Sequence, residues 1–263
     1  MMRALSAVYA AAIYLFIALP VAVLVTFSLQ AGRFPVPPFN GPSLKWYAAV
    51  LDDRRLTDAL VNSLLVGVAS SALAVGLGFL AAVALARHRP FGAGAVRGLI
   101  MAPLMVSYLI IAMGLLITFN AAGLPKSLLA AGLGHTVINL PLCFAIVYSQ
   151  LSDDQATIER AARDLGAGPL TVLFAITAPM VAPALFAAFA LSFTLSWDEF
   201  VIAYLLTRFD VTLPVEIWNL MRSGLNPKTN AVGTIVFAVS VVVVLLAEVW
   251  LRRAFGRRSG RAA

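Results

Sequence analysis

Two adjacent acids, Asp198 and Glu199, are the residues best placed to do chemistry, because they follow Trp197 at the end of a long apolar stretch. An acid at the edge of a membrane span is costly unless it faces water, protein or a cation. Two interpretations stay open. The carboxylates line a path for a cationic solute, or they reach for lipid headgroups at the membrane surface.

Other residue types that often act in catalysis form no recognisable site. Metal sites need several ligands at defined spacings, whereas His88 and His135 stand far apart and Cys143 is the single cysteine. We therefore expect His135 to be structural and Cys143 to be a small apolar residue. The sequence contains no Gly-x-x-x-x-Gly-Lys-Ser/Thr phosphate-binding loop, and no nucleophile and base can be paired from their spacing. We expect no catalytic residues and no metal ligands, so the chain is not an enzyme.

A polar segment at residues 152–169 is predicted to form a short helix. Ser152 and Gln155 have the spacing of a capping box, and two aspartates between them suit the positive end of a helix dipole. Glu159 and Arg163 are one turn apart and are expected to pair. Gly166 is a stop signal. Taken alone, this helix could equally be a solvated connector.

The composition requires a membrane protein. Of the 263 residues, 61% are apolar and 12% charged, and the mean hydropathy of +0.93 excludes an ordinary soluble globule or a disordered chain. Six stretches of at least 19 residues lack Asp, Glu, Lys and Arg: 4–32, 59–86, 98–125, 127–152, 165–197 and 229–247. Each can hold one membrane-spanning helix, and the first is too long for a cleaved signal peptide. The prediction is six transmembrane helices.

The basic residues orient these spans. With both termini in the cytoplasm, 11 of the 19 Lys and Arg residues lie inside, including the dense run Arg252–Arg261. Because that run directly follows a span, we expect it to meet anionic membrane lipid rather than nucleic acid. Outside, Phe34–Pro38 is expected to be extended, and Ser43–Tyr47 to begin an amphipathic segment at the interface.

The segment Glu159–Gly166, followed by Ile176–Pro179, resembles the Glu-Ala-Ala…Gly…Ile-x-Leu-Pro loop of ABC importer permeases. Here Arg160 takes the place of the glutamate, which stands one position earlier, and Ala178 replaces the leucine. In that family the loop forms a coupling helix that docks into a groove of the ATPase subunit. The resemblance implies the following ATPase-coupling residues: Glu159, Arg160, Ala161, Ala162, Asp164 and Gly166.

Within that family, the chain is most similar to the second permease subunit of spermidine/putrescine importers. The similarity is carried by Lys45–Tyr47, Leu191–Glu199 and Asn226–Ala231. It implies a substrate pathway that includes Trp197, Asp198, Glu199 and Tyr108. Tyr108 stands where those permeases tend to have an acid in the third span.

The resemblance also implies a fold and an assembly. We expect an all-α permease of the bacterial inner membrane, with a first helix and outer segment (1–58), a five-helix core (59–251) containing a cytoplasmic coupling loop (152–178), and a basic tail (252–263). The partners would be a related permease subunit, two ATPase subunits that bind ATP and Mg²⁺, and an external solute-binding protein. No cofactor is expected in this chain. The alternatives are an importer of another small solute (an amino-acid derivative, a phosphonate or another organic ion), a channel or secondary transporter without a motor, and a structural scaffold.

Overall fold

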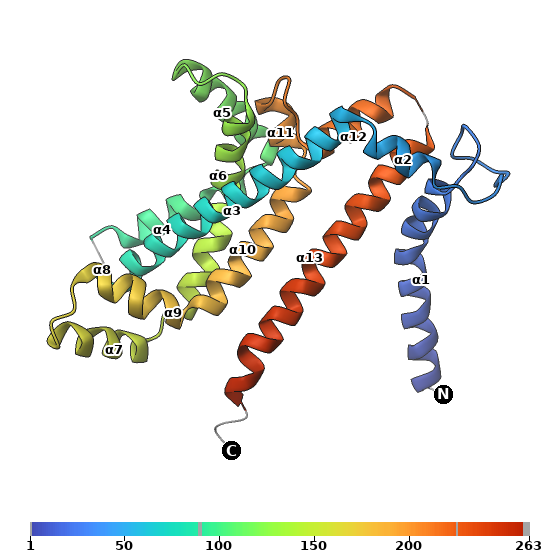
Figure 1. Ribbon diagram of the computed structural model, residues 1–263. Coiled ribbons are helices and arrows are strands. Elements are labelled where there is room, and N and C mark those ends of the chain that lie inside the picture. The colour runs from blue at the N-terminus through green and yellow to red at the C-terminus, as the bar shows by residue number, and fades with distance from the viewer. Residues whose placement is uncertain (1, 89–90, 225, 260–263) are drawn as a thin grey trace. The chain divides into compact units, whose positions relative to one another are not determined.

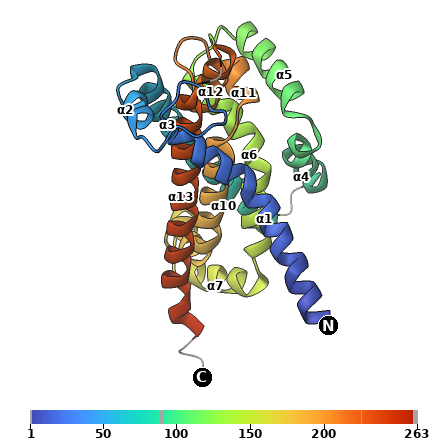
Figure 2. The same ribbon diagram turned by 90° about the vertical axis from the view of Figure 1, so that its right-hand side faces the viewer.

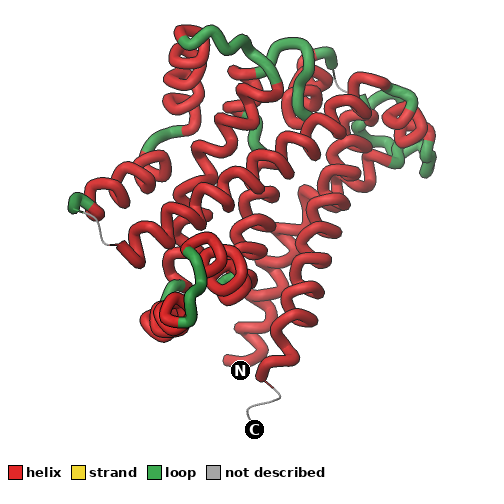
Figure 3. The backbone as a smooth tube through the Cα atoms, turned by 60° about the vertical axis from the view of Figure 1, so that its left-hand side comes forward, coloured by secondary structure: helices red, strands yellow, loops and turns green. Residues whose placement is uncertain are grey.

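The computed structural model describes residues 2–88, 91–224 and 226–259. These residues form helices joined by loops, and they contain no β-strand (Figure 3). The helices are α1 (Met2–Ser28), α2 (Lys45–Leu51), α3 (Arg54–His88), α4 (Ala93–Met101), the 3₁₀-helix η1 (Ala102–Met105), α5 (Tyr108–Ala121), α6 (Leu128–Gln150), α7 (Asp153–Asp164), α8 (Pro169–Thr171), the π-helix η2 (Val172–Thr177), α9 (Ala178–Met180), α10 (Ala182–Trp197), α11 (Val201–Leu206), α12 (Leu213–Arg222) and α13 (Pro227–Ser259). The predicted all-α class is confirmed.

Four of these helices contain segments that are long and apolar enough to cross a membrane: Val8–Ser28, Arg54–His88, Leu128–Gln150 and Pro227–Leu245. Two more candidate spans are bent helix pairs, Ala93–Met105 with Tyr108–Ala121 and Pro169–Met180 with Ala182–Trp197. Counting each bent pair once gives up to six spans in the described part of the chain. Each of these segments overlaps one of the six uncharged stretches of the sequence.

The two bends have local causes. In the first pair the helices turn by 110° where Pro103 sits in η1 and Val106 and Ser107 adopt extended backbone angles. In the second pair the 74° bend falls at Val181, between the helices that contain Pro179 and Pro183. A proline lacks the amide hydrogen that continues a helix, so both breaks occur where prolines interrupt the hydrogen-bond ladder.

The chain divides into two compact units. The first contains Met1–Asp58 and Val215–Val242, and the second contains Ala59–Pro214 and Val243–Ala263. In the first unit the buried side chain of Gln30 organises the proline-rich loop: its amide nitrogen donates to the Val36 and Pro38 carbonyls (3.2 and 3.0 Å), and its oxygen accepts from the Asn40 amide (2.7 Å). The loop is therefore non-helical, as its prolines predict, and α2 follows it.

An ion pair in the same unit joins Asp53 to Lys228 at 2.5 Å. The hydrogen bond from Lys228 holds the pKa of the Asp53 carboxyl below its usual range. A lowered folded-state pKa means that the pair stabilises the fold above the ordinary pKa of an aspartate and that this contribution is lost as the pH falls through the lowered value.

We therefore expect Asp53→Asn to reduce stability by up to about 1 kcal/mol near neutral pH, with the deficit disappearing in the acid range. Thermal unfolding of the detergent-solubilised protein over a pH series measures this. The exposed neighbour provides the control, Asp52→Asn. A deficit for Asp53→Asn that stays constant down to the most acid pH would contradict the assignment.

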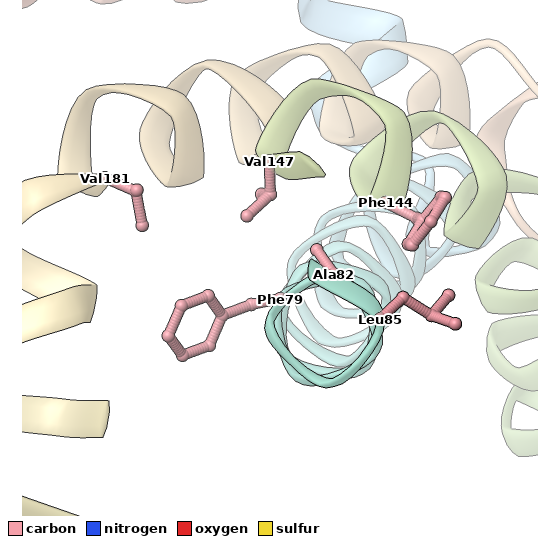
Figure 4. Packing of buried hydrophobic residues seen from close by; sticks show 6 residues of the cluster. All are labelled: Phe79, Ala82, Leu85, Phe144, Val147 and Val181. Carbon is pink, nitrogen blue, oxygen red and sulfur yellow. The ribbon is translucent and has the colours of Figure 1, made fainter. Parts of the chain in front are cut away.

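The second unit is packed around α6, which contacts α5, α10 and α11. One apolar cluster joins α3 to α6 near the bend of the fifth candidate span, and Figure 4 shows its buried members: Phe79, Ala82, Leu85, Phe144, Val147 and Val181. A Cβ on Gly78 would come within 2.8 Å of the Phe144 amide nitrogen, so the glycine allows α3 and α6 to approach closely. A second cluster fixes α5 and α11 against α6.

Within this unit, α7 lies crosswise at one end, whereas α5 and α11 lie at the other (Figures 1 and 2). The coupling segment and the acids that follow α10 are therefore at opposite ends of the same helical unit. This arrangement positions the two candidate sites.

Candidate coupling and translocation sites

The capping box predicted at the start of α7 is present. The Ser152 hydroxyl accepts from the Gln155 amide at 3.4 Å, and the Gln155 side chain accepts from the Ser152 amide at 3.3 Å. These two bonds satisfy amide groups that a helix start otherwise leaves without partners. The N-terminus of α7 is therefore fixed by two residues that lie three positions apart in the chain.

The last turn of α7 is closed by Gly166. This residue has a φ of +89°, its amide donates to the Arg163 carbonyl at 2.9 Å, and the next amide, of Ala167, donates to the Ala162 carbonyl at 3.0 Å. This pair of bonds is the Schellman motif, which needs a left-handed residue at this position and therefore favours glycine.

One face of α7 is exposed in this chain. Among the predicted coupling residues, Arg160, Ala161, Asp164 and Gly166 are exposed and Ala162 is half-buried. The large apolar side chains of Ile158 and Leu165 lie on the same surface, 52% and 89% exposed. Sequence reasoning left out these two residues, although their spacing around Ala161 (i, i+3, i+7) marks one helix face. We call Ile158, Arg160, Ala161, Asp164 and Leu165 the outer face of α7.

Glu159 points the other way. Its carboxylate is buried and accepts two hydrogen bonds from the Arg87 guanidinium, at 2.9 and 3.1 Å, and a third from the Thr177 hydroxyl at 3.0 Å. The predicted pair with Arg163 is therefore wrong. Arg87, in the last turn of α3, donates two hydrogen bonds to the carboxylate in a buried, bidentate ion pair, whereas Arg163 stays exposed on the helix surface. No local spacing could reveal a partner 72 residues upstream.

The acids that follow α10 have different environments. Asp198 is exposed, whereas Glu199 is 6% exposed and Trp197 is 3% exposed. The Glu199 carboxylate accepts from the amides of Val201, Ile202 and Ala203 at 2.9 to 3.2 Å. It therefore caps the start of α11, where free amide groups and the helix dipole favour a negative charge.

A buried histidine completes the surroundings of Glu199. The Nε2 atom of His135 lies 3.3 Å from a Glu199 oxygen, and its Nδ1 atom lies 2.6 Å from the Ser196 hydroxyl. The Ser196 hydroxyl is in turn 3.2 Å from that of Ser70 on α3. We call His135, Ser196, Ser70 and Glu199 the buried polar network. As expected from the sequence, His135 has a structural environment.

The order serine, histidine, acid is also that of a hydrolase triad. Here the three side chains are enclosed by helices, with Ser196 4%, His135 0% and Glu199 6% exposed. A catalytic serine must reach a substrate, so this arrangement serves to connect α3, α6, α10 and the start of α11.

Two further sequence expectations concern isolated residues. Tyr108 begins α5 directly after the 110° bend and is 38% exposed. Within the described residues no hydrogen bond or ion pair connects Tyr108 to Asp198 or Glu199. The same part of the chain contains no group of three or more His, Cys, Asp or Glu side chains that could hold a metal ion.

Comparison with known proteins agrees with this architecture. Residues 74–261 match the family described as binding-protein-dependent transport system inner membrane component. The chain is 32% identical to the spermidine/putrescine transport system permease protein PotC of Escherichia coli strain K12, over 95% of each chain. It is 33% identical to the putrescine transport system permease protein PotI of the same strain, over 93% of this chain and 90% of that one.

A solved structure shares the fold. A chain of the bacterial alginate ABC transporter, in complex with an alginate pentasaccharide-bound periplasmic protein, superposes with a TM-score of 0.74, at 16% identity, over 96% of this chain and 95% of that one. Proteins of the matched family are multi-pass components of the bacterial inner membrane, and a separate ATPase subunit hydrolyses ATP for them. The chain therefore belongs to the family of inner-membrane components of binding-protein-dependent transport systems, the permease subunits of ABC importers.

Proposed function

We propose that this chain is one of two permease subunits in an ABC importer that carries polyamines such as spermidine and putrescine into the cell. The observation that carries the proposal is the 32% identity to a spermidine/putrescine permease over 95% of both chains. In this proposal both termini lie in the cytoplasm, and the second permease subunit is a related but different chain.

The proposed organisation assigns a task to each part of the chain. Residues 1–58 supply the first span and an outer segment, residues 59–251 supply five spans and the cytoplasmic coupling loop 152–178, and residues 252–263 form a basic tail against anionic lipid. The backbone of the tail is helical to Ser259, and its side chains lie outside the described residues. An external binding protein delivers the polyamine.

The coupling role of α7 is supported by its exposed outer face, which combines charges with the apolar side chains of Ile158 and Leu165. Such a mixed surface suits a groove on another protein better than water or lipid. In this proposal the outer face of α7 docks into a groove of one ATPase subunit of the transporter. Closure of the two ATPase subunits around ATP then pushes on α7.

Asp198 is the proposed cargo-facing acid. A polyamine carries several positive charges, and each loses hydration on entering the membrane unless a negative group compensates it. The Asp198 carboxylate is exposed at the end of α10, whereas the Glu199 carboxylate is occupied by three amides and His135. Tyr108, which is 38% exposed, stays in the proposal as a residue that lines the same pathway, and Trp197, which is buried and stacked with Phe193, stays in it as the residue that holds the end of α10 next to Asp198.

We expect Asp198→Asn to lower spermidine uptake about tenfold, because the substitution removes one charge contact and keeps the side-chain shape. Uptake of radiolabelled spermidine and putrescine is measured in proteoliposomes that contain the whole transporter, with ATP on the ATPase side and the binding protein on the other. The matched control is Asp210→Asn, which removes another exposed acid close by in the chain and should leave uptake within about twofold.

Three outcomes would contradict parts of this proposal. Failure of the wild-type transporter to accumulate either polyamine would reject the substrate class, and direct uptake of radiolabelled amino-acid derivatives or phosphonates would then test the other solutes. Equal loss in Asp198→Asn and Asp210→Asn would reject a specific role for Asp198. Uptake that persists without ATP or without the ATPase subunits would favour a channel or secondary transporter.

A further inference from the structure

We propose that Arg87, Glu159 and Thr177 form a joint that connects the coupling helix to two membrane spans, so that displacement of α7 moves the end of α3 and the π-helix η2 together. The proposal rests on the coupling role of α7 given above and names the residues that transmit it. We call these three residues the α7 joint.

The geometry of the ion pair fixes the orientation of α7 relative to α3. The guanidinium contacts both carboxylate oxygens, through Nε at 2.9 Å and through a terminal nitrogen at 3.1 Å. Two parallel hydrogen bonds fix the orientation of the two planar groups as well as their distance. A single bond would let α7 swivel about α3, whereas the double contact resists that rotation.

Burial makes the joint hard to open. The Arg87 and Glu159 side chains are 10% and 3% exposed, respectively. In such a site the removal of one partner leaves an uncompensated charge with little water to solvate it. The two groups should therefore stay together while the rest of the segment moves, which is the property that a mechanical link needs.

Thr177, the third residue of the α7 joint, connects it to the fifth candidate span. The Thr177 hydroxyl lies 3.0 Å from the Glu159 carboxylate and 3.2 Å from the Val172 carbonyl, five residues back in η2. A π-helix has a widened turn and is often found at functional sites. Because η2 leads directly into the 74° bend before α10, the joint connects α7 to the point where that span changes direction.

Apolar packing around the joint is incomplete. A cavity of about 450 Å³ borders Glu159 and Thr177 and is lined also by Val83 of α3 and Leu173 of η2. Space beside the joint means that α7 is not fixed to α3 by a continuous apolar interface. The Arg87–Glu159 ion pair is a direct polar contact between these two helices.

The α7 helix thus has two faces with separate tasks. The outer face, with Arg160, Ala161 and Asp164, is exposed, and Glu159 lies on the opposite, buried side. A push on the outer face can reach the spans through the joint. In this proposal the outer face receives the push and the joint residues transmit it to the spans.

The experiment compares Glu159→Gln with the charge swap Arg87→Glu/Glu159→Arg in the whole transporter. Both uptake of radiolabelled spermidine and ATP hydrolysis are measured in proteoliposomes, and the ratio of the two is the readout. We expect Glu159→Gln to lower this ratio about tenfold while ATP hydrolysis persists, and the swap to recover a large part of it. Thr177→Val should lower the ratio less, since the ion pair remains.

The matched control is Arg163→Gln, which removes an exposed charge that borders the same cavity but forms no ion pair with Glu159 among the described residues, and it should leave the ratio within about twofold. A purely structural role predicts a different result: Glu159→Gln would reduce the amount of assembled transporter, but each assembled complex would keep the wild-type ratio. That result, or a swap no better than the single variants, would overturn the proposal.

A second measurement does not depend on the substrate. Spin labels on His88→Cys and Arg163→Cys, in a Cys143→Ala background, report the separation of α3 and α7 with and without ATP; Arg163 lies on α7 outside its outer face. We expect an unchanged separation when the joint is intact and an ATP-dependent change in Glu159→Gln. A change of equal size with the joint intact would overturn the joint, whereas failure to transport spermidine would reject only the proposed substrate.

Discussion

Replacing Gly166 with proline is expected to abolish uptake while the transporter still hydrolyses ATP or fails to retain its ATPase. Gly166 adopts a φ of +89°, and its amide donates to the Arg163 carbonyl at 2.9 Å. Proline cannot reach a positive φ and has no amide hydrogen, so both the turn and the bond are lost. The end of α7, including the exposed Leu165, would then point in a new direction.

The matched control is Gly166→Asn. Apart from its neighbours in the chain, no heavy atom lies within 4 Å of the position that a Cβ would take at Gly166, so a side chain fits there. Asparagine tolerates the left-handed conformation better than most other residues with a side chain. We expect this variant to keep most of its uptake, at a cost of about 1 kcal/mol in local stability. Uptake and ATP hydrolysis are measured in proteoliposomes at matched expression. Normal uptake by a well-assembled Gly166→Pro transporter would show that the end of α7 has no part in coupling.

The second large effect is expected at Glu199, and it is a loss of folding rather than of transport alone. Glu199→Ala leaves the amides of Val201, Ile202 and Ala203 without their acceptor and leaves His135 without its acid. A buried donor left without its acceptor costs about 1–3 kcal/mol, and three amides lose theirs here. We expect little assembled protein in the membrane and a clearly lower unfolding temperature in detergent.

Glu199→Gln separates the two contributions of this residue. The glutamine carbonyl can still accept from the amides of α11, but the negative charge is gone, so the loss should be smaller than for Glu199→Ala. The amount of assembled protein and its unfolding temperature are compared with those of Asp198→Asn, which should retain both because Asp198 is exposed. Equal stability of all three variants would mean that the network does not support α11.

These expectations treat separately two acids that are adjacent in the sequence. A double substitution of Asp198 and Glu199 would combine a lost cargo contact with a lost helix cap, and reduced uptake could not be assigned to either. Their different roles follow from the directions in which their side chains point. Because α10 ends at Trp197, the next two side chains leave the helix on different sides. One reaches the surface and the other turns toward the first amides of α11.

Much of the architecture could be predicted because its causes are local. Six uncharged stretches correspond to the candidate spans, and the proline-containing ones among them include both bent pairs. The capping box at Ser152 and the stop at Gly166 depend on residues a few positions apart, and both are present in the structure. Hydrophobic length and short-range hydrogen bonding act along the chain, so they can be recognised in the sequence.

The partners of the buried charges were decided only by the tertiary structure. Glu159 has Arg163 one turn away but pairs with Arg87, and Glu199 pairs with His135, far back on α6. Which distant helix approaches a given side chain depends on how spans pack, here on the close contact of α3 with α6 at Gly78 and on the position of α11 against α6. A buried charge then takes the partner that packing brings within hydrogen-bond distance, since leaving it unpaired in an apolar interior costs more than any exposed local pair contributes.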